Sequence, residues 1–372
     1  MKDVQSLIAR EASTAIKGLL MLLVVFGHTS LLTTDYSTGD KTFLWKWLYT
    51  FHVYIFFILP FIYGYKHKTC DRKYGVCGGG WYLIDYQQVI KEAKRNVVKI
   101  GVPYIWFFIL SAIIYIVVGG GQFDIKGLLY TYFWGNEPLI DQYIGFNFMW
   151  FLPAMLALLT LKSIWYNSNK TIKTIIMVLS VTLWLLFAFR VLYRYDLGMY
   201  VPFAISQAFY FILYGIVSRW IIEQHFRMTK ILPLAVVLLI GLTLVYYLFR
   251  KQLASSFINL YAIVNLIMPI LVFIVIYSLR DFLAKSRILK IIGKYSLQIY
   301  LLHVFVLNAI TMVVLHFTQQ SLFMGFVIYI ISILATLAMA VLIEKISWLN
   351  RILFPQITPN ALLTVPKRKN GK

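Results

Sequence analysis

The chain alternates long apolar runs with short stretches that carry charge. Segments without any Asp, Glu, Lys or Arg span residues 18–34, 47–65, 100–123, 142–161, 174–189, 197–218, 231–249, 252–279 and 295–343. A helix needs about 20 mostly apolar residues to cross the hydrocarbon core of a bilayer. The last segment is long enough for two helices, and polar residues from His316 to Ser321 mark the break between them. The pattern therefore predicts ten transmembrane helices.

These runs are too long and too uniformly apolar for the strands of a transmembrane barrel, which alternate over about ten residues. The sequence therefore predicts an all-α polytopic integral membrane protein. Its composition agrees, because 60% of the residues are hydrophobic and only 13% are charged, about half the charged share of a soluble domain. We expect one ten-helix domain over residues 1–350 and a short basic cytoplasmic tail over residues 351–372.

The basic residues are distributed unevenly between the two predicted sides. With ten spans, 28 of the 35 Lys and Arg residues fall on the side that holds both termini, and seven fall on the other. Positive residues concentrate in cytoplasmic loops, so both termini are expected in the cytoplasm of a bacterial inner membrane or plasma membrane. Because topology accounts for most of the net charge of +21, no nucleic-acid partner is expected.

A histidine deep in the first predicted span, His28, is the first candidate for chemistry, because polar groups inside a membrane are costly. Lys17 precedes it by eleven residues, which places both on one helical stripe with His28 roughly 16 Å deeper. This arrangement suits a long anionic substrate that enters from the cytoplasm, with its phosphates at Lys17 and its reactive end at an imidazole base. The structural alternative is a histidine that bonds a neighbouring helix, with Lys17 reaching toward the interface.

Other polar residues permit both structural and functional interpretations. His303, Tyr300 and Ser296 share one stripe of the ninth predicted span, where a bundle contact is as plausible as a role in catalysis. Trp150 is expected at the outer interface, as a membrane anchor or a stacking surface for a sugar ring. The basic residues of the first inner loop, which include Arg95 and Lys99, either grip phosphates or only reflect the positive-inside excess.

A metal site is not expected. His67, Cys70 and Cys77 offer at most three ligands at an irregular spacing, whereas structural zinc sites use four. Both cysteines fall in the first inner loop, where the reducing cytoplasm keeps thiols free. The first apolar segment is followed by no small-residue cleavage site, so we expect it to remain in the mature protein.

Five short motifs occur in order along the chain. They are Ile16-Lys17-Gly18 continuing to Gly27-His28, Phe51-His52 continuing to Phe57, basic residues before Val102-Pro103-Tyr104, Met149-Trp150-Phe151-Leu152, and Gly293-Lys294-Tyr295-Ser296 continuing to His303. Together they resemble the signatures of the acyltransferase 3 family. The resemblance extends from the first to the ninth predicted span and is closest in character to fucose-4-O-acetylase-like sugar O-acetyltransferases.

The resemblance implies transfer of an acetyl group from acetyl-CoA to a hydroxyl of a cell-surface carbohydrate or its lipid-linked precursor. A basic residue, ten intervening residues and a histidine are critical in the family, and Lys17 and His28 occupy these positions. We therefore expect His28 to be catalytic and acetyl-CoA to bind at Lys17, Arg95 and Lys99. The cavity or acceptor site is expected to contain His52, Trp150, Ser296, Tyr300 and His303. Besides acetyl-CoA, the expected partners are a carbohydrate acceptor and membrane lipid.

The chain departs from the family pattern at several positions. Thr14 stands where relatives carry an aspartate, with Glu11 one turn earlier as a substitute, and Pro60-Phe61 replaces a Ser-Gly pair. Paired arginines are replaced by Arg95 and Lys99 at a different spacing. A rival function is a proton-coupled transporter or flippase of an anionic or glycan substrate, which would use the same intramembrane histidines. A receptor or scaffold is a third interpretation, and the sequence contains no internal repeat that would favour a transporter.

Overall fold

The computed structural model describes residues 2–34, 39–63, 84–134, 137–188, 203–223, 228–255 and 260–355. Within these ranges the chain is helical, apart from turns and two isolated bridged pairs, which confirms the predicted all-α fold. The described residues contain eight helical segments that are long and apolar enough to cross a membrane: Arg10–His28, Phe43–Ile62, Tyr86–Val117, Phe148–Tyr166, Ala204–Glu223, Ile231–Phe249, Ser296–Phe317 and Leu322–Lys345. The predictions on His67, Cys70, Cys77 and residues 356–372 lie outside the described residues.

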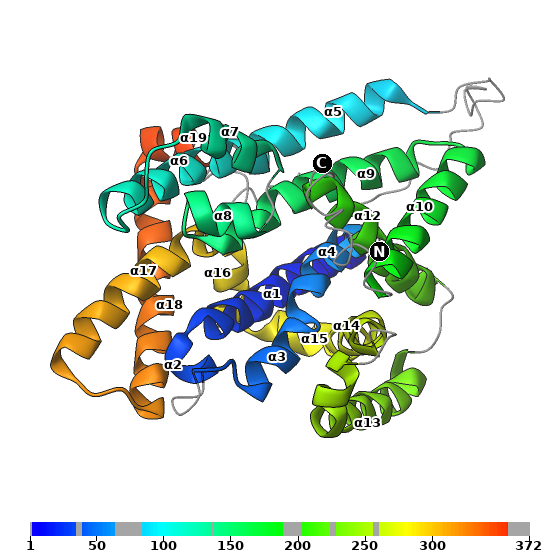
Figure 1. The fold of residues 1–372 in the computed structure, drawn as a ribbon. Coiled ribbons are helices and arrows are strands. Elements are labelled where there is room, and N and C mark those ends of the chain that lie inside the picture. Colours follow the sequence, from blue (N-terminus) through cyan, green and yellow to red (C-terminus); the bar gives the residue numbers. More distant parts are fainter. Residues whose placement is uncertain are drawn as a thin grey trace, which may run out of the picture.

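Helix α1 (Lys2–His28) lies near the centre of the bundle (Figure 1). It packs against α4 (His52–Tyr63), α15 (Arg280–Lys285), α16 (Arg287–Lys294) and α17 (Ser296–Phe317). Because helices surround it on several sides, Ala12, Ala15, Ile16 and Leu20 are fully buried. Two short helices, α2 (Ser30–Thr33) and α3 (Phe43–Tyr49), follow α1 and lead into α4. Together they bring residues of the first two predicted spans to the same end of the bundle.

The third predicted span begins as part of a longer helical unit. Helix α5 (Tyr86–Asn96) passes through a π-helical turn (Val97–Gly101) directly into α6 (Val102–Val117). The side chain of Asp85 caps α5 by accepting a hydrogen bond from the Gln88 amide, as expected of an N-cap aspartate. Pro103 lies in the first turn of α6, where a proline is tolerated. Arg95 in α5 and Lys99 in the π-helical turn therefore lie on one continuous helical unit that leads into this span.

The middle of the chain packs against α4, which contacts α9, α12 and α14. It contains α7 (Ile125–Trp134), α8 (Glu137–Tyr143), a 3-10 turn (Asn147–Trp150), α9 (Phe151–Tyr166), α10 (Lys170–Ala188), α12 (Phe203–Glu223), α13 (Met228–Ser255) and α14 (Leu260–Ser278). Helix α12 packs against both α4 and α9, and α13 packs against α14. Helices α10 and α14 coincide with the two predicted spans that the eight long apolar segments do not include.

The position of α1 in the bundle is fixed by a close contact between its backbone and that of α16. A Cβ atom added to Gly18 would overlap the carbonyl oxygen of Leu289, and one added to Gly293 would overlap the carbonyl oxygen of Thr14. Only glycine permits helices to approach this closely. Helix α17 then runs to Phe317, and α18 (Leu322–Lys345) begins after the predicted polar break and is followed by α19 (Ser347–Leu353).

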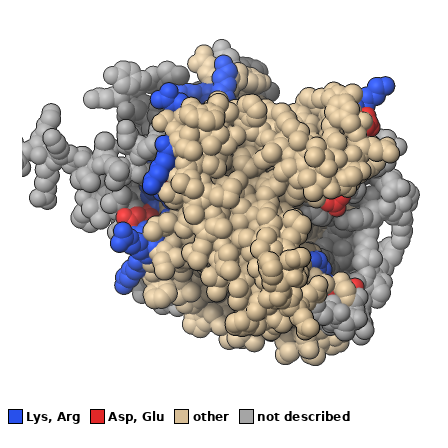
Figure 2. Space-filling view, turned by 90° about the vertical axis from the view of Figure 1, so that its left-hand side faces the viewer, with Lys and Arg blue, Asp and Glu red and all other residues tan. Residues whose placement is uncertain are grey.

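Large apolar side chains cover the surfaces of several long helices. Leu234, Val237 and Ile240 of α13 and Phe323 and Leu334 of α18 are all exposed. Figure 2 shows the side of the molecule on which α17 and α18 lie, and this face is nearly free of charged groups, with Lys and Arg at its margins. A contiguous apolar surface of this extent suits contact with lipid rather than water.

Candidate functional site

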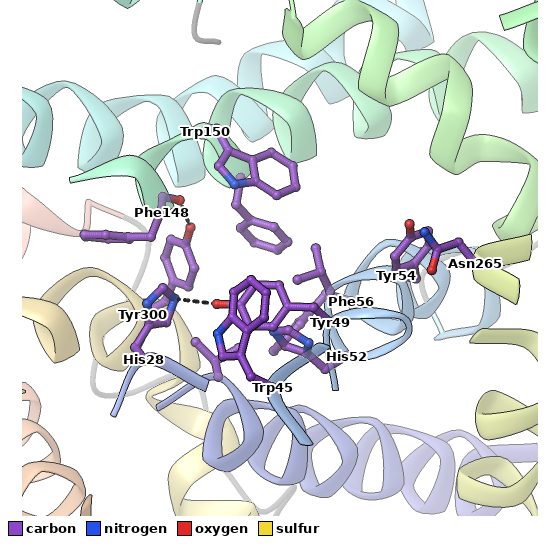
Figure 3. A pocket seen from close by; sticks show the side chains of 13 residues that line it. His28, Trp45, Tyr49, His52, Tyr54, Phe56, Phe148, Trp150, Asn265 and Tyr300 are labelled. Atoms are coloured by element: carbon purple, nitrogen blue, oxygen red, sulfur yellow. Dashed lines mark hydrogen bonds between the residues drawn. The ribbon is translucent and has the colours of Figure 1, made fainter. Parts of the chain in front are cut away.

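A cavity of about 320 Å³ lies between α1, α3, α4, α9, α14 and α17, a volume at the small end of ligand-binding sites. Aromatic rings form most of its wall (Figure 3). The residues that line it are Val24, His28, Trp45, Tyr49, His52, Val53, Tyr54, Phe56, Phe148, Trp150, Phe151, Asn265 and Tyr300. Predicted site residues from four separate segments of the sequence therefore meet at one place.

His28 reaches the cavity because the first helix stops at this residue. Thr29 adopts extended angles, with φ −76° and ψ 95°, and separates α1 from α2. The His28 Nε2 atom lies 3.5 Å from the hydroxyl oxygen of Tyr49, at the long end of the hydrogen-bonding range. The imidazole is thus held at the cavity wall by a weak contact, which leaves it available to an incoming hydroxyl group.

His303 packs edge-on against His28, with 5.0 Å between the two ring centroids. Its Nδ1 atom lies 2.6 Å from the Tyr300 carbonyl oxygen and 3.2 Å from that of Ile299. A carbonyl oxygen only accepts hydrogen bonds, so Nδ1 carries the proton and Nε2 carries the lone pair. The fully buried Nε2 atom has no hydrogen-bond partner among the described residues, so it is a free acceptor beside His28.

The other predicted cavity residues lie around this histidine pair. His52 is anchored in the same way, with Nδ1 2.8 Å from the Leu48 carbonyl oxygen. Tyr300 donates its hydroxyl to the Phe148 carbonyl, which joins α17 to the turn that carries Trp150. Two predicted cavity residues do not line the cavity: Ser296 begins α17, and His303 is fully buried against His28.

Several residues of the cavity wall were not identified from the sequence. Trp45 and Tyr49 stack with ring centroids 4.0 Å apart, and their spacing of four residues on a short helix is the signal that would have indicated one shared face. Asn265 belongs to α14 and lines the end of the cavity opposite His28 (Figure 3). No local pattern distinguishes Asn265, because it occurs within an otherwise apolar helix.

The predicted cofactor-binding cations also come together, although they belong to different helices. The charge of Lys17 on α1 is repelled by Lys99 and Arg10, and that of Lys99 by Arg95. Lys17 makes no hydrogen bond or ion pair with any residue in the described ranges. Cations gathered without a counter-ion form a site for an anion. We call Lys17, Arg95 and Lys99 the cation cluster.

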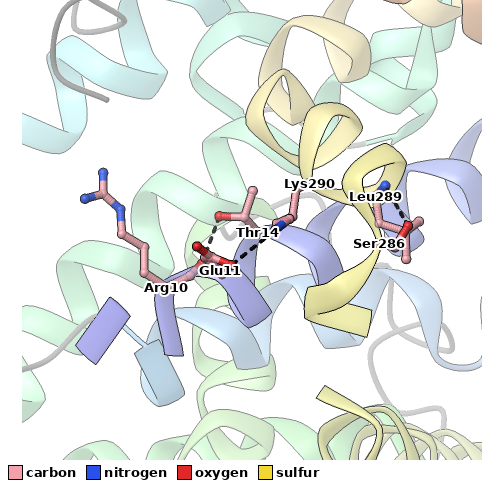
Figure 4. Close-up of polar contacts among 6 residues, drawn as sticks. All are labelled: Arg10, Glu11, Thr14, Ser286, Leu289 and Lys290. Carbon is pink, nitrogen blue, oxygen red and sulfur yellow. Dashed lines mark hydrogen bonds and ion pairs between the residues drawn. The ribbon is translucent and has the colours of Figure 1, made fainter. Parts of the chain in front are cut away.

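Glu11 does not neutralise this cluster. Its carboxylate pairs with Lys290 of α16 at 3.1 Å, and Thr14 donates its hydroxyl to the Arg10 carbonyl (Figure 4). Figure 4 also shows the Ser286 side chain accepting the Leu289 amide at the start of α16. The ion pair of Glu11 therefore connects α1 to α16. Thr14 and Glu11, which stand in for the family aspartate, bond to neighbouring helix residues rather than to the cation cluster.

A family model for an acyltransferase domain, the acyltransferase 3 model, matches residues 11–345. The chain belongs to this family and is a multi-pass membrane acyltransferase. No curated protein and no solved structure matches it significantly.

Proposed function

We propose that this acyltransferase transfers acetyl from acetyl-CoA to a hydroxyl of a cell-surface carbohydrate or its lipid-linked precursor. The observation that carries the proposal is the layout of α1, which places Lys17 in the cation cluster and His28 in the wall of an aromatic cavity. Both lie on one helix stripe roughly 16 Å apart. This separation suits an acyl donor with phosphates at one end and a thioester at the other.

The cation cluster suits the phosphates of CoA, because the charge of Lys99 acts on that of Lys17 and the charge of Arg95 acts on that of Lys99, which joins basic side chains of α1 and the α5–α6 unit. Charge-assisted hydrogen bonds to phosphate oxygens are about twice as strong as neutral ones. We place this end of the bundle on the cytoplasmic side of a bacterial inner membrane or plasma membrane, where CoA is available and where the positive-inside pattern puts both termini.

Gln298 is suited to bind the linker between the two ends of the donor. It is 1% exposed, and neither its amide oxygen nor its amide nitrogen has a partner among the described residues. A buried amide without partners costs free energy. The pantetheine arm of CoA carries amide groups that supply the matching donor and acceptor, and Gln298 precedes His303 by five residues on α17.

In the proposed reaction, His28 accepts the proton of the acceptor hydroxyl, whose oxygen forms a bond to the acetyl carbonyl carbon. The carbon–sulfur bond of the thioester breaks, and the CoA thiolate takes the proton back from the imidazole. His303 contributes a fixed acceptor nitrogen next to His28, which favours one orientation of the neighbouring ring. The aromatic wall excludes water and thereby limits hydrolysis of the donor.

The test is acetyl transfer by purified protein in lipid nanodiscs, with labelled acetyl-CoA and a glycan acceptor. His28→Ala is expected to abolish transfer while the acetyl-CoA-dependent rise in melting temperature remains. The matched control is His316→Ala, which removes an exposed histidine of α17 that is not part of the cavity. Full transfer by His28→Ala would overturn the catalytic role, and glycan transport without any transfer would favour the rival transporter.

A further inference from the structure

A short helix between the first two predicted spans forms an aromatic wall on one side of the cavity. Trp45 and Tyr49 of α3 stack with an interplanar angle of 26°, and both line the cavity. The Thr42 hydroxyl caps α3 by accepting the Trp45 amide at 3.3 Å. In Figure 3 these rings lie across the cavity from Trp150. The weakly positive C–H face of a sugar ring packs well on such rings, whose faces are electron-rich.

One cation lies beside this wall. The Lys41 Nζ atom is 5.5 Å from the centre of the Trp45 ring and 3.3 Å from the Thr34 hydroxyl oxygen. The pairing of Thr34 with Lys41 fixes the backbone at this point, and the charge of Lys41 reaches His28. Lys41 does not itself line the cavity, but it lies beside Trp45, which does, and it is distinct from the cation cluster.

No acidic side chain of the described residues forms an ion pair with Lys41 beside the cavity. None of the residues that line the cavity is an aspartate or glutamate. Lys41 is exposed, and partial burial of its side chain lowers its pKa, because the charged form loses some hydration there. An anionic ligand beside Trp45 would offset that loss.

We propose, resting on the function proposed above, that the acceptor is an acidic carbohydrate whose carboxylate or phosphate group pairs with Lys41 while its sugar ring packs on Trp45. The hydroxyl to be acylated then lies toward His28. Tyr49, which stacks on Trp45 and contacts His28, links the sugar platform to the base. A neutral sugar, with Lys41 serving only to stabilise the Trp45 ring, is the alternative that the experiment must distinguish.

The experiment compares two probes that differ at one group, methyl glucuronide and methyl glucoside. Their dissociation constants are measured by saturation-transfer NMR on the full chain in phosphatidylcholine nanodiscs, which carry no anionic lipid. The glucuronide is expected to bind about five- to tenfold more tightly, as one charge-assisted contact provides. Glucose 1-phosphate serves as a third probe, and its rank against the glucuronide distinguishes a phosphate from a carboxylate.

Variants identify the residues that are responsible for any preference among the probes. Lys41→Gln is expected to remove the preference for acidic probes without weakening the glucoside, and Trp45→Ala is expected to weaken all three probes while Trp45→Phe retains binding. Lys46→Gln is the matched control, because it removes a charge from α3 and leaves the contact between Lys41 and the Trp45 ring in place. Equal affinities, a preference that survives in Lys41→Gln, or no binding of any probe would overturn the inference.

The failure of this inference is distinguishable from failure of the proposed function. Acetyl-CoA is added to the same samples and the melting temperature is recorded. Stabilisation of the wild-type protein that is lost in Lys17→Ala, together with no preference for acidic probes, rejects the acidic acceptor alone. An absence of stabilisation by saturating acetyl-CoA rejects the proposed donor instead.

Discussion

His28 at the end of α1 and His303 in α17 lie with ring centroids 5.0 Å apart. The Nδ1 atom of His303 is held by two backbone carbonyls, whereas its Nε2 atom has no partner among the described residues. A histidine that only packs needs its anchored Nδ1 atom alone. The Nε2 atom without a partner is what a histidine that acts on its neighbour requires.

The two nitrogens of His303 can be tested separately. His303→Asn keeps a donor for the backbone carbonyls and removes the Nε2 acceptor, whereas His303→Gln keeps a polar group near the position of Nε2. We expect His303→Asn to lower kcat for acetyl transfer by about 10- to 100-fold, which is at or below the roughly 10²- to 10⁴-fold contribution of a group that itself transfers the proton. The melting temperature and the KM for acetyl-CoA should change little. Wild-type kcat in His303→Asn would show that the residue only packs.

The cation cluster predicts that the phosphates of the donor determine its affinity. Lys99→Ala is expected to raise the KM for acetyl-CoA by about five- to tenfold, because one charge-assisted contact is lost, and to leave the KM for acetyl-pantetheine unchanged. Lys345→Ala, which removes an exposed cation at the end of α18, is the control. An equal rise for both donors would contradict phosphate binding at Lys99.

Salt should affect the same interaction. Raising ionic strength shortens the screening length from about 10 Å at 0.1 M to about 3 Å at 1 M. The KM for acetyl-CoA is therefore expected to rise with salt, while that for acetyl-pantetheine stays constant. Saturation curves at several salt concentrations measure both values, and a KM for acetyl-CoA that does not respond would show that the cations do not bind it.

The contact between α1 and α16 leaves no space for a side chain at Gly18. Gly18→Ala would place a methyl group on the Leu289 carbonyl oxygen, and overpacking of this kind costs about 1–3 kcal/mol or more. We expect a lower melting temperature and reduced acetyl-CoA binding, since Lys17 is the adjacent residue. Gly241→Ala is the control, because nothing lies within 4 Å of a Cβ atom there. Equal stability of the two variants would contradict the close contact.

Gln298 should matter to the donor rather than to the acceptor. Gln298→Leu removes an amide that has no partner among the described residues, so the protein is expected to be as stable as wild type or more stable. The KM should rise for both acetyl-CoA and acetyl-pantetheine, because the two donors share the amide groups. Steady-state kinetics with both donors measure this, and an unchanged KM would exclude Gln298 from the donor site.

The sequence alone determined the class of the protein and the positions of its long helices. The free energy of transferring a segment into a bilayer depends on the residues of that segment alone. Charge-free runs therefore identified the segments now seen as α6, α13, α17 and α18, and the polar residues from His316 to Ser321 correctly separated the last two. Lys17 and His28 were also identifiable, because their spacing within one helix fixes their relative position.

Only the tertiary structure decided which side chains meet. The neighbours of His28 come from α3, α17 and the turn before α9, and no spacing along the chain specifies how these elements rotate and approach one another. Packing sets that geometry, as at Gly18 and Gly293, where two backbones touch. The same packing keeps Ser296 out of the cavity and brings Trp45 to it, because burial depends on neighbouring helices as well as on residue type.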